Sequence, residues 1–189
     1  EEKVGQLIQL IGRFYREETK DIMTGPEEEI GLPPKYLDLP GSIMNIYGAD
    51  RLKKLQTECM EKQPHHIPVL FMMDIIHGMK TIFPVPLGQA ATFDPELTRM
   101  GAEIAAKESA VMGLHVGFSP MSDLVRDPRW GRVVESYGED PYMISRFVEA
   151  HVKGFQGTNM KEPGKMCACI KHFAGYGGAE AGRDYNTVS

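Results

Sequence analysis

Short apolar runs alternate with amphipathic segments along most of the chain. Runs that are wholly apolar and lie between polar turns are typical of buried parallel strands. Four such strands are expected, at residues 41–47, 67–73, 114–119 and 166–170. Helices are expected between them, because apolar side chains there recur every three or four residues.

Three of these helices are expected to begin at an aspartate. Asp50 is a candidate N-cap, and Asp94-Pro95 and Asp140-Pro141 each pair an N-cap with proline at the first helical position. Gly113 is expected to end the second helix. The predicted apolar faces are, in chain order, Leu52, Leu55 and Cys59; Leu97, Met100, Ile104 and Val111; and Ile144, Phe147, Val148, His151, Val152 and Phe155.

The N-terminal quarter of the chain has a different pattern. Residues 1–11 have apolar positions close to helical spacing and acids in the first turn, which predicts an opening helix. Residues 13–40 are polar and rich in Glu, Gly and Pro, so an irregular segment is expected. With no linker and no shift in composition, residues 1–189 are expected to form one structural unit.

The resulting order is one helix followed by β-α-β-α-β-α-β. Strict alternation of this kind predicts an α/β fold whose strands are parallel and joined by right-handed crossovers.

Charge and cysteine content narrow the classes of function. The net charge is 21 − 26 = −5, which gives no basic surface for nucleic acid or an anionic membrane. No apolar run is long enough to span a bilayer. The three cysteines, Cys59, Cys167 and Cys169, are too few for a disulfide framework. Cys-x-Cys within an apolar run fits buried thiols better than zinc ligands, so neither metal nor cofactor is expected.

The sequence also bears on the compartment. No signal peptide is present, which favours a cytoplasmic location over a periplasmic or secreted one. The chain opens on Glu1 rather than Met, and its start looks trimmed.

Polar side chains follow three of the four expected strands. Asp74 follows the second strand, an arginine-rich loop with Arg132 follows the third, and Lys171 and His172 follow the fourth. Because the carboxyl ends of parallel strands lie at one edge of a sheet, these side chains are expected to gather there. A carboxylate that accepts hydrogen bonds and cations that donate them suit an uncharged polyol.

Taken singly, each of these residues also has a structural interpretation. Asp74 caps a turn, Lys171 extends to solvent and His172 is a hydrogen-bonded core histidine. In the same interpretation, Trp130 only packs in the core. The arginines of the loop have three candidate acidic partners, Asp123, Asp127 and Glu135.

Four motifs resemble those of one enzyme family. They are D-x-x-H-G at residues 74–78, T-x-F-P-x-x-L-G at 81–88, D-x-x-R-D-P-R-W-G-R with E-S-Y-G-E-D at 123–140, and K-H-F-x-x-Y-G with R-D-Y-N at 171–186. In this order they resemble the N-terminal barrel domain of glycoside hydrolase family 3, the β-glucosidase and β-xylosidase family. Residues 1–7 are similar to the opening helix of that domain.

The resemblance implies a fold and an activity. Residues 1–189 would be the first half, about four βα units, of a (β/α)8 TIM-type barrel, completed in the parent protein by the rest of the barrel and a following α/β domain. The parent would hydrolyse terminal non-reducing β-D-glucosyl or β-xylosyl residues by a retaining mechanism. Tyr176 occupies the position of a histidine used by an N-acetylglucosaminide branch, which favours the glucoside or xyloside branch.

The resemblance also implies residue roles. Asp74 would accept hydrogen bonds from hydroxyls of the sugar in the −1 subsite, and Arg132, Lys171 and His172 would hold the remaining hydroxyls. The nucleophile and the acid/base would come from beyond Ser189, and we expect no turnover from this chain alone. Arg126, Asp127 and Arg129 would shape their loop, and His77 and Gly78 the turn after Asp74.

Two other functions stay open at this point. One is a non-catalytic carbohydrate-binding half barrel. The other is a phosphate-handling α/β enzyme, which is disfavoured because the glycines of residues 175–178 do not open a helix in the required pattern.

Lys171 and His172 pose a geometric problem. Adjacent residues of a regular strand point to opposite faces, so both side chains cannot reach one pocket unless the backbone is irregular. We therefore predict an abnormal backbone between Ile170 and Phe173, and the resemblance implies non-proline cis peptide bonds there.

Overall fold

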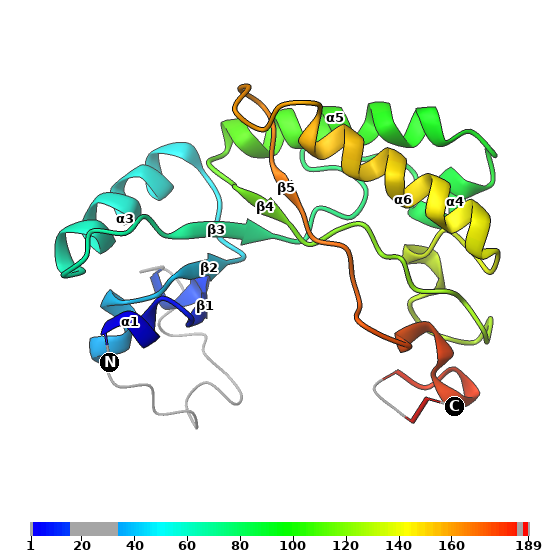
Figure 1. Cartoon of the computed structure of the whole chain (residues 1–189), viewed down its shortest axis with the longest axis horizontal. Coiled ribbons are helices and arrows are strands. Elements are labelled where there is room, and N and C mark those ends of the chain that lie inside the picture. Colours follow the sequence, from blue (N-terminus) through cyan, green and yellow to red (C-terminus); the bar gives the residue numbers. More distant parts are fainter. Residues whose placement is uncertain (1, 16–33, 185–186, 189) are drawn as a thin grey trace. The chain divides into compact units, whose positions relative to one another are not determined.

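The computed structural model describes residues 2–15, 34–184 and 187–188 of the chain (Figure 1). The chain divides into two compact units, which are described separately. Unit 1 comprises Glu1–Met73 and Met112–His115, and unit 2 comprises Asp74–Val111 and Val116–Ser189. Among the described residues, no helix has the length and apolar character needed to cross a bilayer.

The described residues of unit 1 form three parallel strands and one long helix. Its elements are α1 (Glu2–Gly5), β1 (Gln9–Ile11), η1 (Gly12–Tyr15), η3 (Pro34–Asp38), β2 (Ser42–Met44), α3 (Ala49–Lys62) and β3 (Leu70–Met73). The strands pair in the order β1-β2-β3, with Leu10 beside Ile43 and Ile43 beside Phe71. All three side chains are buried, so this row forms part of the core of the unit.

The prediction of a single helix over residues 1–11 is wrong. Only Glu2–Gly5 is helical, and Gln9–Ile11 is a strand. The carbonyl of Ile8 accepts a hydrogen bond from Gly41 N–H at 3.0 Å, leading the chain into its pairing with β2. Val4 and Leu7 of the supposed apolar face are 62% and 85% exposed. Pairing of Leu10 with Ile43 in the sheet therefore overrides the local helical spacing.

The helix predicted after Asp50 is present as α3, and its predicted face is buried. Its N-cap, however, is Gly48 and not Asp50, which lies in the first turn. Gly48 has φ 114°, a conformation that glycine adopts readily, and its N–H donates to the carbonyl of Met112 at 3.0 Å. This hydrogen bond ties the start of the helix to the segment that contains Met112.

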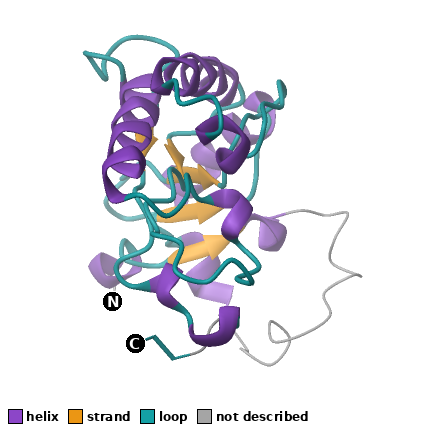
Figure 2. Ribbon diagram, turned by 90° about the vertical axis from the view of Figure 1, so that its right-hand side faces the viewer, coloured by secondary structure: helices purple, strands orange, loops and turns teal. Residues whose placement is uncertain are grey.

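In unit 2, two parallel strands and two long helices lie within the part that the structure describes. Its elements are α4 (Pro86–Ala90), α5 (Pro95–Val111), β4 (Val116–Gly117), η4 (Val133–Glu135), α6 (Pro141–Gln156), β5 (Cys167–Ala168), η5 (Tyr176–Gly178) and η6 (Glu180–Gly182). β4 and β5 pair in parallel, and α5 and α6 lie side by side (Figures 1 and 2). The described residues thus hold five strands, one more than predicted, because the first was taken for helix.

The capping predictions for α5 and α6 are confirmed. Asp140 is the N-cap of α6, and its carboxylate accepts from Met143 N–H at 2.7 Å. Asp94 accepts from Glu96 N–H at 3.0 Å at the start of α5. Each proline after the aspartate begins the helix, as its fixed φ favours.

The predicted apolar face of α5 is wrong. Leu97, Met100, Ile104 and Val111 are between 40% and 74% exposed. The buried positions carry small side chains: Thr98, Ala102, Ala105, Ala106 and Ser109. The reason is the close approach of α6. A Cβ on Gly154 of α6 would lie 2.6 Å from the Cβ of Ala102, so the interface accepts only small residues.

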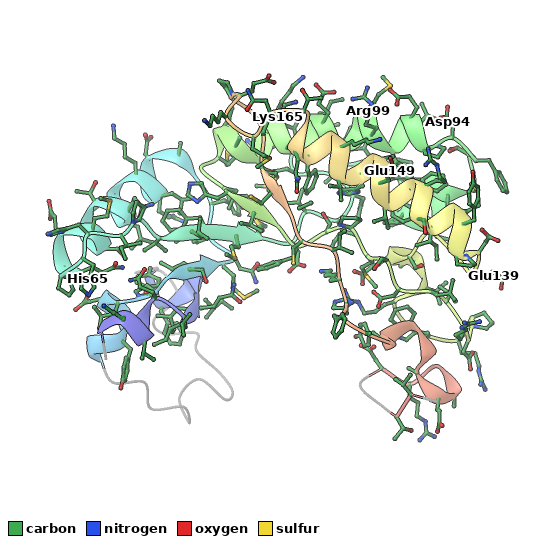
Figure 3. The ribbon with its side chains drawn as sticks, viewed as in Figure 1. His65, Asp94, Arg99, Glu139, Glu149 and Lys165 are labelled. Carbon is green, nitrogen blue, oxygen red and sulfur yellow. The ribbon has the colours of Figure 1, made fainter. Side chains whose placement is uncertain are left out.

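Ion pairs cover the outer surface of α5 (Figure 3). Glu103 lies 3.0 Å from Arg99 of the same helix and 4.0 Å from Lys165 of the loop before β5. These ion pairs connect the loop to the helix.

The prediction that the Cys-x-Cys thiols are buried is wrong for Cys167. Met166 is buried, whereas Cys167 is exposed and Cys169 half-buried. Successive side chains of a strand point to opposite faces. A Cβ on Gly117 of β4 would lie 3.1 Å from the Met166 methyl group, so Met166 occupies the covered face and Cys167 the other.

A buried chain of hydrogen bonds runs through unit 2 to the residue after Asp74. The hydroxyl of Ser119 donates to the carbonyl of Ile75 at 2.7 Å, and Nε2 of His151 lies 3.1 Å from the same hydroxyl. His151 Nδ1 lies 3.0 Å from the hydroxyl of Tyr137. Since the Ser119 proton goes to Ile75, His151 donates through Nε2 and accepts through Nδ1. Burial lowers the pKa of His151 to about 3, which keeps the imidazole neutral.

Candidate functional site

Asp74 and Lys171 form an ion pair. Asp74 directly follows β3 in the chain and Lys171 follows β5, and Lys171 Nζ lies 2.7 Å from Asp74 Oδ1. The Lys171 side chain is 13% exposed, whereas that of Asp74 is 47% exposed. The carboxylate thus has one fixed cationic partner and an open side on which a ligand can bind.

The turn after Asp74 is fixed by its own hydrogen bonds, as expected for the D-x-x-H-G motif. The backbone carbonyl and the ring of His77 both contact Phe83: the carbonyl accepts from Phe83 N–H at 2.8 Å, and Nδ1 lies 2.8 Å from the Phe83 carbonyl. Gly78 has φ 126°, and a Cβ there would collide with the carbonyl of Thr81. Only glycine fits this position.

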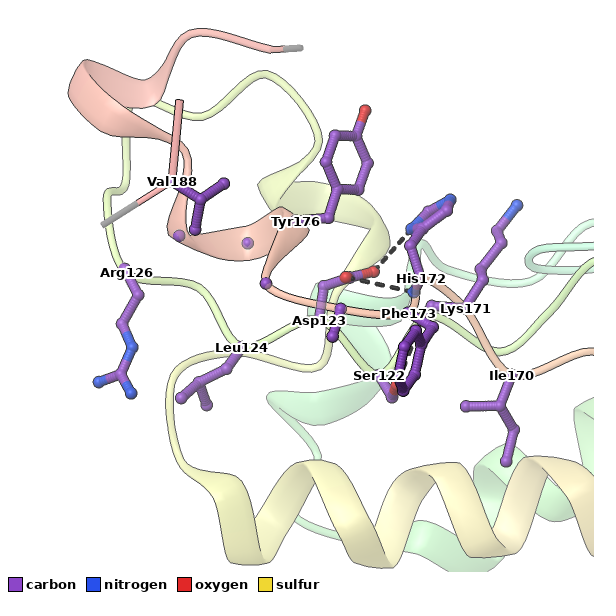
Figure 4. A pocket seen from close by; sticks show the side chains of 14 residues that line it. Ser122, Asp123, Leu124, Arg126, Ile170, Lys171, His172, Phe173, Tyr176 and Val188 are labelled. Carbon is purple, nitrogen blue, oxygen red and sulfur yellow. Dashed lines mark hydrogen bonds and ion pairs between the residues drawn. The ribbon is translucent and has the colours of Figure 1, made fainter. Parts of the chain in front are cut away.

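His172 is held by a buried carboxylate. Its Nδ1 lies 2.9 Å from Oδ2 of Asp123, and its backbone N–H donates to Oδ1 of Asp123 at 3.2 Å (Figure 4). The Asp123 side chain is only 1% exposed. A buried carboxylate must be hydrogen-bonded, and both of its oxygens are directed at this one residue.

The predicted irregular backbone is confirmed. The peptide bonds Lys171–His172 and Phe173–Ala174 are both cis, and neither involves proline. The side chain of Lys171 meets Asp74, that of His172 meets Asp123, and Phe173 is fully exposed.

Arg132 is paired with Glu135 in a two-pronged contact. Its Nε and Nη2 each lie 2.7 Å from a carboxylate oxygen of Glu135. The remaining nitrogen, Nη1, lies 3.5 Å from His172 Nε2 and 3.4 Å from the hydroxyl of Tyr176. Arg132 therefore touches the histidine on the side opposite to Asp123.

Glu135 connects the predicted cations. Hydrogen bonding from Arg132 lowers the pKa of Glu135, and electrostatic attraction from Lys171 lowers it further. Arg132 thus links Glu135 to His172, and the neighbouring residue Lys171 links this group to Asp74. The structure brings all four together within unit 2.

Aromatic rings support this cluster. Tyr176 makes edge-to-face contacts with His172, at 4.6 Å between ring centroids, and with Trp130, at 5.1 Å. Trp130 is buried, and its Nε1–H donates to Asp184 at 2.9 Å. Tyr185 and Asn186, the end of the fourth motif, lie outside the described residues.

The loop before Arg132 is braced by a local pair. Asp127 accepts from the backbone N–H and the guanidinium of Arg129, and these bonds lower its pKa to about 2. Asp127 and Arg129 therefore shape the loop, as expected.

A cavity of about 530 Å³ opens beside the cluster (Figure 4). Its lining includes Asp123, Lys171, His172 and Tyr176, together with Arg126, whereas Asp74 and Arg132 do not line it. Arg126 thus faces this hollow from the loop that carries Arg132. The volume is in the range of small-molecule sites.

Three partners were not identified from the sequence as part of the site: Asp123, Glu135 and Tyr176. Asp123 and Glu135 were assigned only as candidate partners of arginines, and Asp123 binds His172 instead. Their signal was position, because both lie in the motif that contains Arg132. Charge alone did not distinguish them from the exposed acids nearby.

Comparison with known proteins identifies the family. The family model described as the N-terminal domain of glycosyl hydrolase family 3 matches residues 1–189. The chain belongs to glycosyl hydrolase family 3. Its βα order and parallel strands are those of the first part of the (β/α)8 TIM-type barrel, which confirms the predicted fold class.

Solved and curated family 3 proteins resemble the chain over most of its length. A mutant β-glucosidase from Listeria innocua in complex with laminaribiose has a TM-score of 0.90 and 44% identity, covering 100% of this chain and 27% of that one. The periplasmic beta-glucosidase of Salmonella typhimurium is 38% identical over 148 residues, covering 78% of this chain and 19% of the relative. A putative beta-xylosidase of Formosa agariphila is 34% identical over 156 residues, covering 79% and 21%. The chain thus spans about a fifth of the length of these curated relatives.

Proposed function

We propose that the protein containing this chain hydrolyses terminal non-reducing β-D-glucosyl residues, with β-xylosyl residues as its second substrate class. The proposed mechanism is a retaining double displacement, in which Asp74, Arg132, Lys171 and His172 hold the sugar in the −1 subsite. The names of the family 3 relatives support this choice, and a Listeria innocua β-glucosidase is described in complex with glucose.

The observation that carries the proposal is the arrangement of donors and acceptors in the cluster of Asp74, Lys171, His172 and Arg132. Lys171 and Arg132 supply N–H donors, whereas Asp74 supplies an acceptor that is half exposed. A pyranose presents neighbouring hydroxyls that each donate and accept, so alternating partners at one edge match its pattern. Rigid hydroxyl contacts of this kind can favour the distorted ring of an oxocarbenium-like transition state.

The same contacts favour binding over bond cleavage as the task of these residues. A retaining glycosidase needs one carboxylate as nucleophile and a second as acid/base, about 5–5.5 Å apart. Asp74, Asp123 and Glu135 are each paired with a cation or an imidazole, and the lowered pKa of Glu135 does not suit an acid. The proposal therefore assigns neither catalytic carboxylate to residues 1–189 and expects both elsewhere in the parent protein.

The test is hydrolysis of aryl β-glucosides and β-xylosides by the full-length protein. We expect turnover of both, a higher kcat/KM for the glucoside, and a covalent adduct detectable by mass spectrometry with a slow-leaving 2-fluoro sugar. The isolated 189-residue chain should give no turnover. Sugar binding by the full-length protein without turnover would favour the non-catalytic carbohydrate-binding alternative.

A further inference from the structure

The ring of His172 lies between two groups of opposite hydrogen-bonding character. At Nδ1 it meets Asp123, whose carboxylate oxygen at 2.9 Å accepts hydrogen bonds. At Nε2 it meets Arg132 Nη1 at 3.5 Å, and a guanidinium can only donate. Both neighbours require the same tautomer, with the proton on Nδ1 and the lone pair on Nε2.

We propose that Asp123 is a positioning residue that fixes His172 in the Nδ1–H tautomer, so that Nε2 accepts a hydrogen bond from one hydroxyl of the bound pyranose. This inference rests on the proposed function, since it names how His172 takes part in sugar binding. Asp123 does not touch the sugar in this scheme. Its side chain is 1% exposed and acts through the imidazole.

His172 Nε2 and Arg132 Nη1, which lie 3.5 Å apart, together select one kind of ligand group. Nε2 of His172 accepts, while Nη1 of Arg132 donates. A hydroxyl that bridges them must donate to the histidine and accept from the arginine. A fluorine at the same carbon can accept but has no proton to donate, so the site should discriminate against it.

Asp123→Asn is expected to weaken this preference. Oδ1 of residue 123 accepts from the backbone N–H of His172 at 3.2 Å, and this bond keeps the amide oxygen of asparagine on that side. The amide NH2 then faces Nδ1 and donates to it, which moves the imidazole proton to Nε2. The histidine becomes a donor toward the sugar, so the bridging hydroxyl loses the acceptor of its proton and part of its advantage over fluorine.

The experiment measures binding of D-glucose and of its singly deoxyfluorinated analogues to the full-length protein by calorimetry. For one ring position, we expect the wild type to bind glucose at least about fivefold more tightly than the analogue with fluorine at that position. That ratio should fall in Asp123→Asn, while the ratios at the other positions stay unchanged. Asp127→Asn, in the same loop but paired with Arg129, is the matched control and should keep the wild-type ratio. An unchanged ratio in Asp123→Asn at every position would overturn the inference.

A second measurement does not depend on sugar binding. The ¹⁵N shifts of the His172 ring, assigned by comparison with His172→Gln, report the tautomer directly. A protonated Nδ1 and an unprotonated Nε2 support the inference, and the reverse pattern refutes it even if the protein is an active glucosidase. Failure of the wild type to bind any glucose analogue would instead refute the proposed function, and the ring shifts would still decide the tautomer.

Discussion

Lys171 Nζ lies 2.7 Å from Asp74 Oδ1, although the two residues are 97 positions apart in the chain. In the chain, Asp74 directly follows β3, and Lys171 comes after Cys169 and Ile170, which follow β5. This ion pair is the contact that turns separate polar strand ends into one candidate site, and the lysine is the more buried of the two.

Replacement of Lys171 by methionine should lower kcat/KM for an aryl β-glucoside by about 10- to 100-fold. Loss of a charge-assisted hydrogen bond costs about 1.5–3 kcal/mol, and Asp74 loses its cationic partner as well. Because the two residues act together, the effects of Lys171→Met and Asp74→Asn should not add in a double-mutant cycle. Lys161→Met, at an exposed lysine, is the control and should retain wild-type kinetics. Additive losses from the two site variants would show that the pair is not coupled.

Glu135→Gln should destabilise the protein at neutral pH, by about 1–3 kcal/mol, because it breaks the two-pronged contact with Arg132. The pKa of Glu135 is lowered in the folded state from its ordinary 4.5. Its contribution is therefore complete above that value and is lost as the pH falls through the lowered folded pKa. Urea unfolding at a series of pH values should show that the difference in unfolding free energy between wild type and variant decreases as the pH falls.

Glu149→Gln provides the comparison for that measurement. Glu149 also pairs with cations, Arg146 and Lys153, but these side chains are 42–62% exposed. Solvent screens such contacts, so the variant should change the unfolding free energy by less than about 1 kcal/mol. Equal effects of the two substitutions would contradict the special role given to Glu135.

His151 should make stability fall as the pH drops below about 6.5. Its pKa is lowered to about 3 in the folded state, so between these values the unfolded chain binds a proton that the folded protein does not. The slope from this residue can reach about 1.4 kcal/mol per pH unit. His151→Gln, compared with wild type by chemical unfolding from pH 7 downward, should remove this component, and an unchanged slope would contradict the assignment.

Tyr137→Phe tests the series of buried hydrogen bonds that contains His151, at the end opposite to Ser119. The substitution leaves His151 Nδ1 without its donor and should cost about 1–3 kcal/mol of unfolding free energy. Tyr142→Phe, on the same region of the chain but 70% exposed, should be close to neutral. Thermal or urea unfolding of both variants checks the difference.

Gly154→Ala should be strongly destabilising, by about 2 kcal/mol or more, because the new methyl group has no room between α6 and α5. Gly101→Ala in α5 is the matched control. A Cβ there makes ordinary contacts with Phe83 at 3.5 Å, so alanine should be tolerated and gain about 0.5–1 kcal/mol from its helix propensity. Similar unfolding free energies for the two variants would contradict the close helix packing.

The sequence was a good guide where local chemistry decides the structure. Asp140-Pro141 begins α6 as predicted, since a cap and a fixed φ act within one turn. Prediction from the sequence failed where contacts between residues far apart in the chain decide the structure. Residues 9–11 form a strand because β2 pairs with them, and α5 buries alanines because α6 lies close against it.

The candidate site shows the same division. Asp74, Arg132, Lys171 and His172 were found because each ends a strand or lies in a motif. The pairing of His172 with Asp123 was not predicted, because the two residues are 49 positions apart and no local pattern links them. Which acid pairs with which cation depends on the loop path, and the loop path depends on packing.

A crystal structure of the full-length protein with bound glucose tests the central claim most directly. The account predicts one glucose ring within hydrogen-bonding distance of Asp74, Arg132, Lys171 and His172 together, with all four side chains at a common site. Glucose bound elsewhere, or these four side chains directed to separate surfaces, would contradict it.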